Sequence, residues 1–380
     1  MRLSPAEPVR SGAATRIVLV TPGLAGADGI SAVSRLYLQI LAARAARAGI
    51  PIEAWSLNDT GTPEGIPAGV RVRHADRSVL KFLAFGVRAT AWRRGALVVV
   101  LHVGLLPALA PLLWRGVRLV PVLHGIEAWV HVRRRTAWML RYAWRAIAVS
   151  AETRRRFIAA NSGLSAMDVR VCHSALAGPA VEPSAADVDS VRRLTEGRPC
   201  AVIVGRLAAR ERYKGHDALI DAWPLVVAAV PDARLLVVGE GDDAARLRAR
   251  AADLCAPGGV VFAGRLTDAQ VEAVYREARF LAMPSTGEGL GLVYLEAMRA
   301  GRPCLASPGA AEEVVVHGEN GVIVLQQDRA ALVAWIVRLF QDHAWRDGLG
   351  REARRTVTER FTVAHLDRRL GEALGCTEMV

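Results

Sequence analysis

Two glutamates, Glu288 and Glu296, lie eight positions apart in a glycine-rich stretch where a predicted buried strand gives way to a short helix. Gly289 and Gly291 keep the backbone uncrowded at the start of that helix, where unpaired N–H groups and the helix dipole attract anions. Eight residues are a little over two helical turns, so the carboxylates could face one ligand at two depths. The pattern predicts a site for a ligand with a phosphate at one end and hydroxyl groups to hold.

Two cations, Arg206 and Lys214, are spaced across the loop that follows the predicted strand 200–205 and opens a helix. A planar guanidinium fork and a mobile ammonium group together suit a diphosphate. A solvated basic loop would have the same composition. Because the glutamates belong to the same predicted domain, the combination favours phosphate binding.

Two further positions in the first half of the chain are candidates. His124 ends a very apolar predicted strand, with Gly125 leaving space and Glu127 nearby. Ligands of open α/β sheets bind at the carboxyl ends of strands, which favours a functional histidine over a satisfied core histidine. Gly29 precedes a helix start whose N–H groups could meet a phosphate, although a simple tight turn would look the same.

Other motifs favour no site. Gly239, Gly241 and Ala244 match the dinucleotide fingerprint G-x-G-x-x-A after a strand. A dinucleotide site requires this motif in the first βα unit of its domain, whereas here it lies in the second, so we interpret it as a tight turn from strand to helix. Asp187 and Asp189 have the form of a D-x-D metal motif within a predicted linker. The histidines show no ligand spacing, so we expect neither a metal nor another cofactor.

Strands alternate with helical patterns in two series, which predicts an α/β protein with two doubly wound parallel sheets. The alternation lapses over residues 173–198, the expected domain boundary. We therefore expect one domain over 1–178 and a second over 179–360. Consecutive helices are expected after residue 330.

The segment 95–114 is twenty residues long without a formal charge and passes the length test for a membrane span. Its first part is β-branched and its second part contains two prolines, so a strand followed by a short buried helix explains it better. The five cysteines are isolated, which favours a reducing compartment over a disulfide framework. Residues 1–15 have no apolar core of signal-peptide length.

The net charge of +12 is unevenly distributed. Residues 1–180 carry 24 Lys and Arg against 9 Asp and Glu, whereas residues 181–380 carry 25 against 28. Such a basic half indicates an anionic partner, either a membrane surface, a lipid phosphate or a nucleic acid. Arg and Lys occur among Leu, Phe and Trp at near-helical spacing over 78–95 and 131–145, which favours a membrane interface over ordinary amphipathic helices whose Trp residues pack inward.

The chain resembles the retaining glycosyltransferases of family 4, most closely in its second half. The segments VGRL, RYKGHDALIDAW, LLVVGEGDDAARL and MPSTGEGLGLVYLEAMRAGRPCLAS carry the likeness, and Glu288 and Glu296 match the E-x7-E motif of the family. The resemblance implies a GT-B fold, in which two Rossmann-like doubly wound domains face each other across a cleft. It also implies that the C-terminal helix, about 361–380, crosses back to the N-terminal domain.

The same resemblance implies roles for individual residues. In relatives, the residues that match Arg206 and Lys214 bind the donor diphosphate. The residue that matches Glu288 contacts the sugar hydroxyls, assisted by backbone N–H groups of the segment that matches Gly289, Leu290 and Gly291. The residue that matches Glu296 holds the ribose. Arg265 is expected beside the nucleobase, His124 near the reacting sugar, and Gly29 near phosphate or acceptor. The implied catalytic set is His124, Glu288, Arg206 and Lys214.

The chain departs from the family at three places: Asp28 replaces a glycine of the first loop, the segment 172–174 replaces Asn-Gly, and Leu290 replaces a common phenylalanine. The first two departures concern the acceptor side, whereas the donor cations and glutamates are retained.

The predicted function is metal-independent, retaining transfer of a hexose from a nucleotide sugar to a lipid-linked or saccharide acceptor. Mannose from GDP-mannose is the preferred donor, and UDP-glucose or another UDP-hexose is the alternative. A nucleotide-sugar hydrolase, a phosphorylase-like enzyme, a non-catalytic nucleotide-sugar or lipid-binding protein and an NAD-dependent oxidoreductase are the other hypotheses. The expected location is cytoplasmic, peripheral on the inner face of the plasma membrane, without a nucleic-acid partner.

Overall fold

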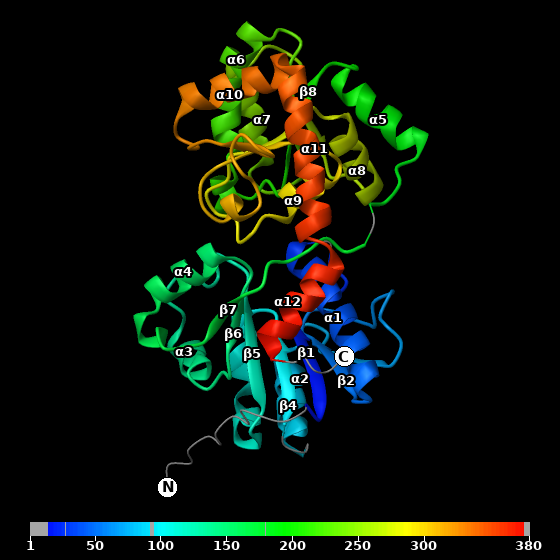
Figure 1. Ribbon diagram of the computed structural model, residues 1–380, viewed down its shortest axis with the longest axis vertical. Helices are drawn as coiled ribbons and strands as arrows, with labels where there is room; N and C mark the ends of the chain where they lie inside the picture. Colours follow the sequence, from blue (N-terminus) through cyan, green and yellow to red (C-terminus); the bar gives the residue numbers. More distant parts are fainter. Residues whose placement is uncertain (1–13, 27, 92–94, 179, 376–380) are drawn as a thin grey trace. The chain divides into compact units, whose positions relative to one another are not determined.

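The computed structural model describes residues 14–26, 28–91, 95–178 and 180–375 and divides into two compact units (Figure 1). Unit 1 comprises Met1–Ala177 with Val363–Val380, and unit 2 comprises Gly178–Thr362. Each unit contains one parallel β-sheet flanked by helices. The α/β fold class expected from the alternating pattern is confirmed.

The sheet of unit 1 has seven parallel strands in the order β3-β2-β1-β4-β5-β6-β7. These strands are β1 (Arg16–Thr21), β2 (Ile52–Ser56), β3 (Val70–His74), β4 (Ala96–Val100), β5 (Arg118–Leu123), β6 (Ala146–Ala148) and β7 (Val169–Val171). The central strand β1 pairs with both β2 and β4, with Ile17 opposite Ile52 on one side and Leu97 on the other. Chain order reverses between β1 and β4, which makes this point the switch of the sheet.

The helical segments of unit 1 are α1 (Gly29–Ala48), α2 (Val79–Arg88), η1 (Ala89–Ala91), η2 (Val103–Arg115), α3 (Arg134–Leu140), α4 (Ala151–Ala160), η3 (Ser162–Leu164) and α12 (Val363–Leu374). The C-terminal helix α12 lies beside α1 (Figure 1), and Arg44 Nε donates to the Asp367 carboxylate at 2.6 Å. The Arg44 side chain is almost buried, so this pair holds α12 on unit 1 more firmly than an exposed ion pair would.

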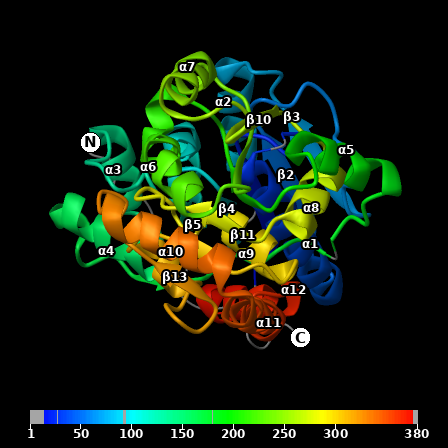
Figure 2. The same cartoon turned by 90° about the horizontal axis from the view of Figure 1, so that it is seen from above.

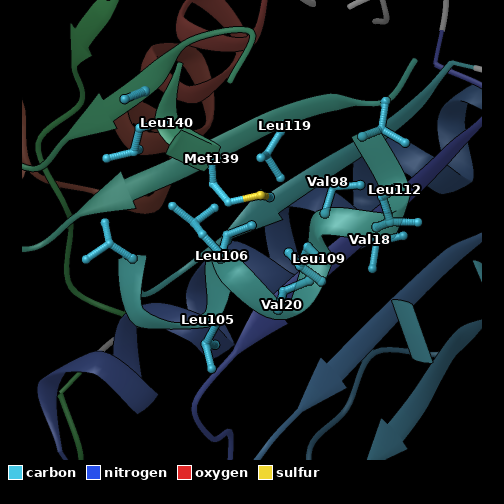
Figure 3. Packing of buried hydrophobic residues seen from close by; sticks show 14 of the residues in the cluster. Val18, Val20, Val98, Leu105, Leu106, Leu109, Leu112, Leu119, Met139 and Leu140 are labelled. Atoms are coloured by element: carbon cyan, nitrogen blue, oxygen red, sulfur yellow. The ribbon is translucent and has the colours of Figure 1, made fainter. Parts of the chain in front are cut away.

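The apolar segment 95–114 forms strand β4 and the 3₁₀ helix η2, as expected from its prolines and β-branched residues. Leu106, Leu109 and Leu112 of η2 are at most 1% exposed and pack with the strand residues Val18 and Val98 in the core (Figure 3). Burying each leucine contributes roughly 2 kcal/mol, which explains the strongly apolar composition. No helix in the described part of the chain is long and apolar enough to cross a membrane.

The sheet of unit 2 has six parallel strands in the order β10-β9-β8-β11-β12-β13. They are β8 (Cys200–Val204), β9 (Arg234–Val238), β10 (Val260–Gly264), β11 (Phe280–Met283), β12 (Cys304–Ala306) and β13 (Gly321–Ile323). Chain order reverses between β8 and β11, which are hydrogen-bonded neighbours with Phe280 opposite Ala201. The loops after these two strands therefore meet at the switch point of the sheet.

Helices cover both faces of the unit 2 sheet, with α6, α7 and α10 on one side of β11 and α8 on the other (Figure 2). The helical segments are α5 (Ala185–Thr195), η4 (Ala209–Lys214), α6 (His216–Ala229), α7 (Ala244–Leu254), α8 (Asp268–Glu277), α9 (Leu292–Arg299), η5 (Ala310–Glu313), α10 (Arg329–Gln341) and α11 (His343–Arg360).

Two predictions about elements are wrong. Strand β3 was not expected, because its sequence VRVRH is polar at the edge of the sheet. The stretch 173–198 is not linker throughout, because α5 occupies its second half in unit 2. Asp187 belongs to a capping box with Ser184 at the start of α5, which explains its place in the D-x-D motif without a metal.

Candidate active site

Two loops at the carboxyl edge of the unit 2 sheet bring three of the predicted residues close together. Arg206 and Lys214 lie in the loop after β8, and Glu288 lies in the loop after β11. Lys214 Nζ lies 3.1 Å from Glu288 Oε1, which also accepts a hydrogen bond from Ser285 Oγ at 3.2 Å. Both charged side chains are mostly buried, at 13% and 16% exposure, so this pair is screened less than a surface ion pair.

Glu211 links the two cations. Its Oε1 lies 2.5 Å from Arg206 Nη2, and its Oε2 lies 3.9 Å from Lys214 Nζ. Glu211 is buried, whereas the Arg206 side chain is 62% exposed. Arg206 is therefore accessible to an anionic ligand, although its departure would leave the buried Glu211 carboxylate with a weaker partner and would cost more than breaking an exposed ion pair.

The loop after β8 is held by the turn after β9. Leu207 N donates to Glu240 O at 2.9 Å, and Asp243 N donates to Leu207 O at 2.8 Å. A Cβ at Gly239 would stand 1.9 Å from the carbonyl oxygen of Gly205, so only glycine fits there. The glycines of the G-x-G-x-x-A match thus have a packing role that needs no dinucleotide.

Gln326, which follows β13, joins the two site loops. Its Nε2 donates to Tyr213 O at 2.9 Å and to Pro284 O at 2.7 Å. Thr286 N donates to the same Tyr213 carbonyl at 3.0 Å. One amide group therefore fixes the loop that carries Lys214 relative to the loop that carries Glu288.

The aromatic ring of Tyr213 lies against Gly287, where a Cβ would come within 2.4 Å of the ring. Burial raises the pKa of the Tyr213 phenol, and Glu211 and Glu288 raise it further, so the hydroxyl stays protonated at neutral pH. Lys214 Nζ stands 5.7 Å from the centre of the ring. Tyr213 thus forms one wall beside the Lys214–Glu288 pair.

The Gly-Leu-Gly segment leads into α9. Leu290 is buried, and Gly291 adopts a left-handed conformation with φ +86° at the N-cap. No side chain of a described residue caps α9, unlike the capped starts of α8 and α10. The first N–H groups of α9 therefore point to the site loop without a carboxylate or hydroxyl in front of them.

Glu296 has a different set of partners from Glu288. It lies on α9 and accepts a hydrogen bond from Tyr275 Oη of α8 at 2.9 Å. Burial raises the pKa of the Glu296 carboxyl, against the opposing effects of Tyr275 and Arg299. No hydrogen bond joins the Glu288 and Glu296 carboxyl groups, so the geometry gives no support to an acid/base pair.

Arg265 follows β10 and is exposed to solvent, and β9 and β8 lie between β10 and β11 in the sheet. The structure therefore does not bring Arg265 into contact with the Lys214–Glu288 pair. Its position beside the nucleobase stays a prediction.

In unit 1, His124 directly follows β5, and its imidazole Nε2 is buried without a hydrogen bond to any described residue. Burial lowers the pKa of His124; the nearby Glu127 opposes this effect, and His102 adds to it. The Glu127 carboxylate accepts the backbone N–H groups of His124 at 2.6 Å and Gly125 at 3.2 Å. A neutral imidazole with an unused nitrogen at a strand end suits polar contact with a substrate.

Gly29 is the first residue of α1, and Asp28 caps the helix. The Asp28 carboxylate accepts the N–H groups of Ile30 at 3.0 Å and Ser31 at 3.1 Å. Burial opposes ionisation of Asp28, but hydrogen bonds from Ser31 and Ile30 outweigh it and lower its pKa. A phosphate at this helix start would have to displace a carboxylate, an obstacle that a glycine at position 28 would not create.

Sequence reasoning did not single out Glu211, Tyr213, Ser285 or Gln326. Glu211 and Tyr213 lie between the two predicted cations and could have been suspected from that position. Gln326 is separated from Tyr213 by 113 residues, and no motif marks it. Within the described residues, no group of three or more His, Cys, Asp or Glu side chains could hold a metal ion.

Comparison with known proteins finds relatives for the second half of the chain. Residues 198–342 match the family described as glycosyl transferases group 1. The chain is 31% identical over 239 residues to a GDP-mannose-dependent alpha-(1-6)-phosphatidylinositol monomannoside mannosyltransferase of Mycolicibacterium smegmatis, covering 60% of each chain. It is 33% identical over 187 residues to a GDP-mannose-dependent monoacylated alpha-(1-6)-phosphatidylinositol monomannoside mannosyltransferase of Corynebacterium glutamicum, covering 47% of this chain and 48% of the relative. The chain thus matches about half the length of these relatives.

Solved structures are similar over nearly the whole chain. A sucrose-phosphate synthase from Thermosynechococcus elongatus superposes with a TM-score of 0.76 at 22% identity, covering 95% of this chain and 98% of that one. Anabaena HepE, solved in complex with UDP and glucose, superposes with a TM-score of 0.72 at 20% identity, covering 95% and 99%. The chain therefore has the GT-B fold, and its residues 198–342 match the glycosyl transferases group 1, in agreement with the resemblance carried by the motifs around Glu288 and Glu296.

Proposed function

We propose that the chain is a retaining glycosyltransferase that moves a hexose from a nucleotide sugar to a lipid-linked or saccharide acceptor. The observation that carries the proposal is the pairing of Lys214 with Glu288 across the switch point between β8 and β11, with Arg206 beside them. The two cations and the uncapped start of α9 suit the diphosphate of the donor. Glu288 suits the sugar hydroxyls.

Mannose from GDP-mannose is the proposed donor sugar, because the relatives above are named as GDP-mannose-dependent enzymes. UDP-hexoses remain the alternative. A thermal-shift series with GDP-, UDP- and TDP-sugars ranks the donors, because a ligand that binds only the folded state raises the melting temperature. A larger shift with UDP-glucose than with GDP-mannose would replace the donor assignment while keeping the site.

In the proposed reaction, the acceptor hydroxyl oxygen bonds to the anomeric carbon on the face from which the diphosphate leaves. The bond between the anomeric carbon and the phosphate oxygen breaks, and the acceptor proton passes to the departing diphosphate. Lys214 and Arg206 stabilise the negative charge that develops there, without a metal ion. Glu288 positions the sugar, Glu296 the ribose, and His124 the reacting end of the substrate.

Replacement of Lys214 by alanine tests this site. Loss of one charge-assisted contact in a partly buried site costs about 1.5–3 kcal/mol, or roughly ten- to hundred-fold in donor affinity. Isothermal titration with GDP-mannose measures the effect, and Arg351→Ala, an exposed arginine of α11, is the matched control. Unchanged donor affinity in Lys214→Ala would mean that the site is wrongly placed.

An acceptor requirement separates the remaining hypotheses. A transferase releases nucleoside diphosphate only when an acceptor is present, a hydrolase releases it without one, and a binding protein releases none. Turnover that persists in excess EDTA is expected for the metal-independent reaction. NAD titration without a thermal shift would exclude the oxidoreductase hypothesis.

Unit 1 is the proposed membrane-facing part, at the inner face of the plasma membrane. Helix α2 exposes Val79 by 61%, Leu80 by 80% and Val87 by 58%, next to Lys81 and Arg88. Apolar side chains flanked by cations suit an anionic lipid interface. Leu80→Glu should weaken sedimentation with phosphatidylglycerol vesicles, whereas Leu254→Glu on unit 2, also exposed, should not. Equal binding of both variants would contradict a membrane role for α2.

A further inference from the structure

A polar hollow of about 230 Å³ lies in unit 2, at the end of the strands opposite to the Lys214–Glu288 pair. Cys200 begins β8 and Arg279 directly precedes β11, so the hollow adjoins the amino ends of the strands whose carboxyl ends carry the donor loops. Its charged lining consists of Arg192, Arg198, Arg276, Arg279, Arg302 and Glu277. Five guanidinium groups thus surround one carboxylate.

Three of the five arginines have carboxylate partners. Arg192 Nε lies 3.0 Å from Glu277 Oε2, Arg276 pairs with both Glu182 and Glu272, and Arg198 lies 3.4 Å from Asp232. These pairs satisfy three of the five guanidinium groups that line the hollow.

The other two arginines lack such a partner. Arg302 Nε donates to the backbone carbonyl of Tyr275 at 3.0 Å, and its Nη2 donates to that of Arg276. Arg279 is exposed, and its side chain forms no hydrogen bond or ion pair with any described residue. Glu277 and Asp347 act on Arg302 electrostatically, but neither forms an ion pair with it. Arg302 and Arg279 therefore line the hollow without a direct carboxylate partner.

These positive charges act on one another. Burial lowers the pKa of Arg302, and the neighbouring guanidinium groups of Arg279 and Arg346 lower it further. Like charges at close range destabilise the fold unless an anion joins them. An anion in the hollow would remove this repulsion.

We propose that this hollow, called the arginine pocket from here on, binds a compact phosphate anion, either free or as the phosphoryl group of a lipid headgroup. Arginine forks bind phosphate oxygens bidentately, and Arg279 and Arg302 supply two of them. The volume is below the roughly 300–1,000 Å³ of pockets for drug-sized ligands, which favours a compact anion. The site is separate from the proposed donor site, because it lies at the other end of the same strands.

The test measures binding of inorganic pyrophosphate by isothermal titration to the full-length chain carrying Lys214→Ala, which weakens the donor site. Pyrophosphate should still bind. Adding Arg279→Ala should weaken it by about ten-fold or more, as expected for one lost charge-assisted contact. Adding Arg351→Ala should leave it unchanged. Melting temperatures without ligand verify that each variant folds.

A vesicle assay distinguishes the two sources of the phosphate. If Arg279→Ala weakens sedimentation with phosphatidylglycerol vesicles, the source is a lipid headgroup; if it weakens only pyrophosphate binding, the source is a free anion. The proposal is overturned if Arg279→Ala affects neither, or if Lys214→Ala alone abolishes pyrophosphate binding. Neither result depends on whether the chain transfers a sugar.

Discussion

Gln326 offers the sharpest test of how the site is held, because one amide group joins its two loops. In Gln326→Leu both hydrogen bonds of Nε2 are lost, while the side-chain volume stays similar. The Tyr213 carbonyl keeps Thr286 N–H as a donor, whereas the Pro284 carbonyl loses the donor described for it. At roughly 0.5–1.5 kcal/mol for each hydrogen bond, the expected loss is about 2 kcal/mol of unfolding free energy.

Calorimetry provides the first measurement. A domain of 150–250 residues changes its melting temperature by roughly 2–4 °C for each kcal/mol, so the transition of unit 2 should fall by about 4–8 °C. Gln327→Leu is the matched control, because Gln327 is the adjacent residue, is exposed and makes no side-chain hydrogen bond to a described residue.

Donor titration provides the second measurement. If the Gln326 amide fixes the position of Lys214 relative to Glu288, Gln326→Leu should also weaken GDP-mannose binding several-fold at a temperature where the protein is folded. Equal melting temperatures for the two leucine variants, together with equal donor affinities, would refute the reasoning. A fall in melting temperature with unchanged affinity would mean that Gln326 stabilises the loops without positioning the site.

Three further perturbations have a definite sign. Burial and the nearby Lys214 lower the pKa of His216 to about 4, so between pH 6.5 and pH 4 the unfolded chain protonates this histidine while the folded chain does not. Up to about 3 kcal/mol of unfolding free energy should therefore be lost as the pH falls from 6.5 to 4. In His216→Asn, melting temperatures measured over the same pH range should lack this dependence. Because burial raises the pKa of Glu296, ionisation of this carboxyl destabilises the folded wild type as the pH rises. The melting temperature of Glu296→Gln should therefore increase relative to that of the wild type between pH 4 and pH 7. A difference between the two melting temperatures that does not change with pH would contradict this. In helix α11, a Cβ at Gly348 would meet only Arg351 Nη2, at 3.8 Å, so Gly348→Ala should stabilise the folded protein by about 0.5–1 kcal/mol. A Cβ at Gly350 would stand 2.3 Å from Gly301 O, so Gly350→Ala should lower the melting temperature. Equal effects of the two substitutions would be inconsistent with this packing.

Much of the architecture could be predicted because the relevant signals are local. Buried parallel strands are continuous apolar runs, and β8 and β4 lie in the segments 200–205 and 95–114, where such runs predict strands. Strand β3 gave no such signal, because an edge strand with a polar face does not need apolar residues. Helix α5 was missed because its polar, serine-capped sequence resembles a linker when only composition is considered.

The chemical character of the donor site was also present in the sequence, because Arg206, Lys214 and Glu288 all lie between the carboxyl end of a strand and the following α-helix. The order of the strands decided that the loops of Lys214 and Glu288 meet, 74 residues apart in the chain. Only the tertiary structure revealed the Gln326 bridge and the arginine pocket, because both depend on side chains from loops and helices that are distant in sequence. Local pattern thus determined the elements and their reactive groups, while strand order and packing determined which groups share a site.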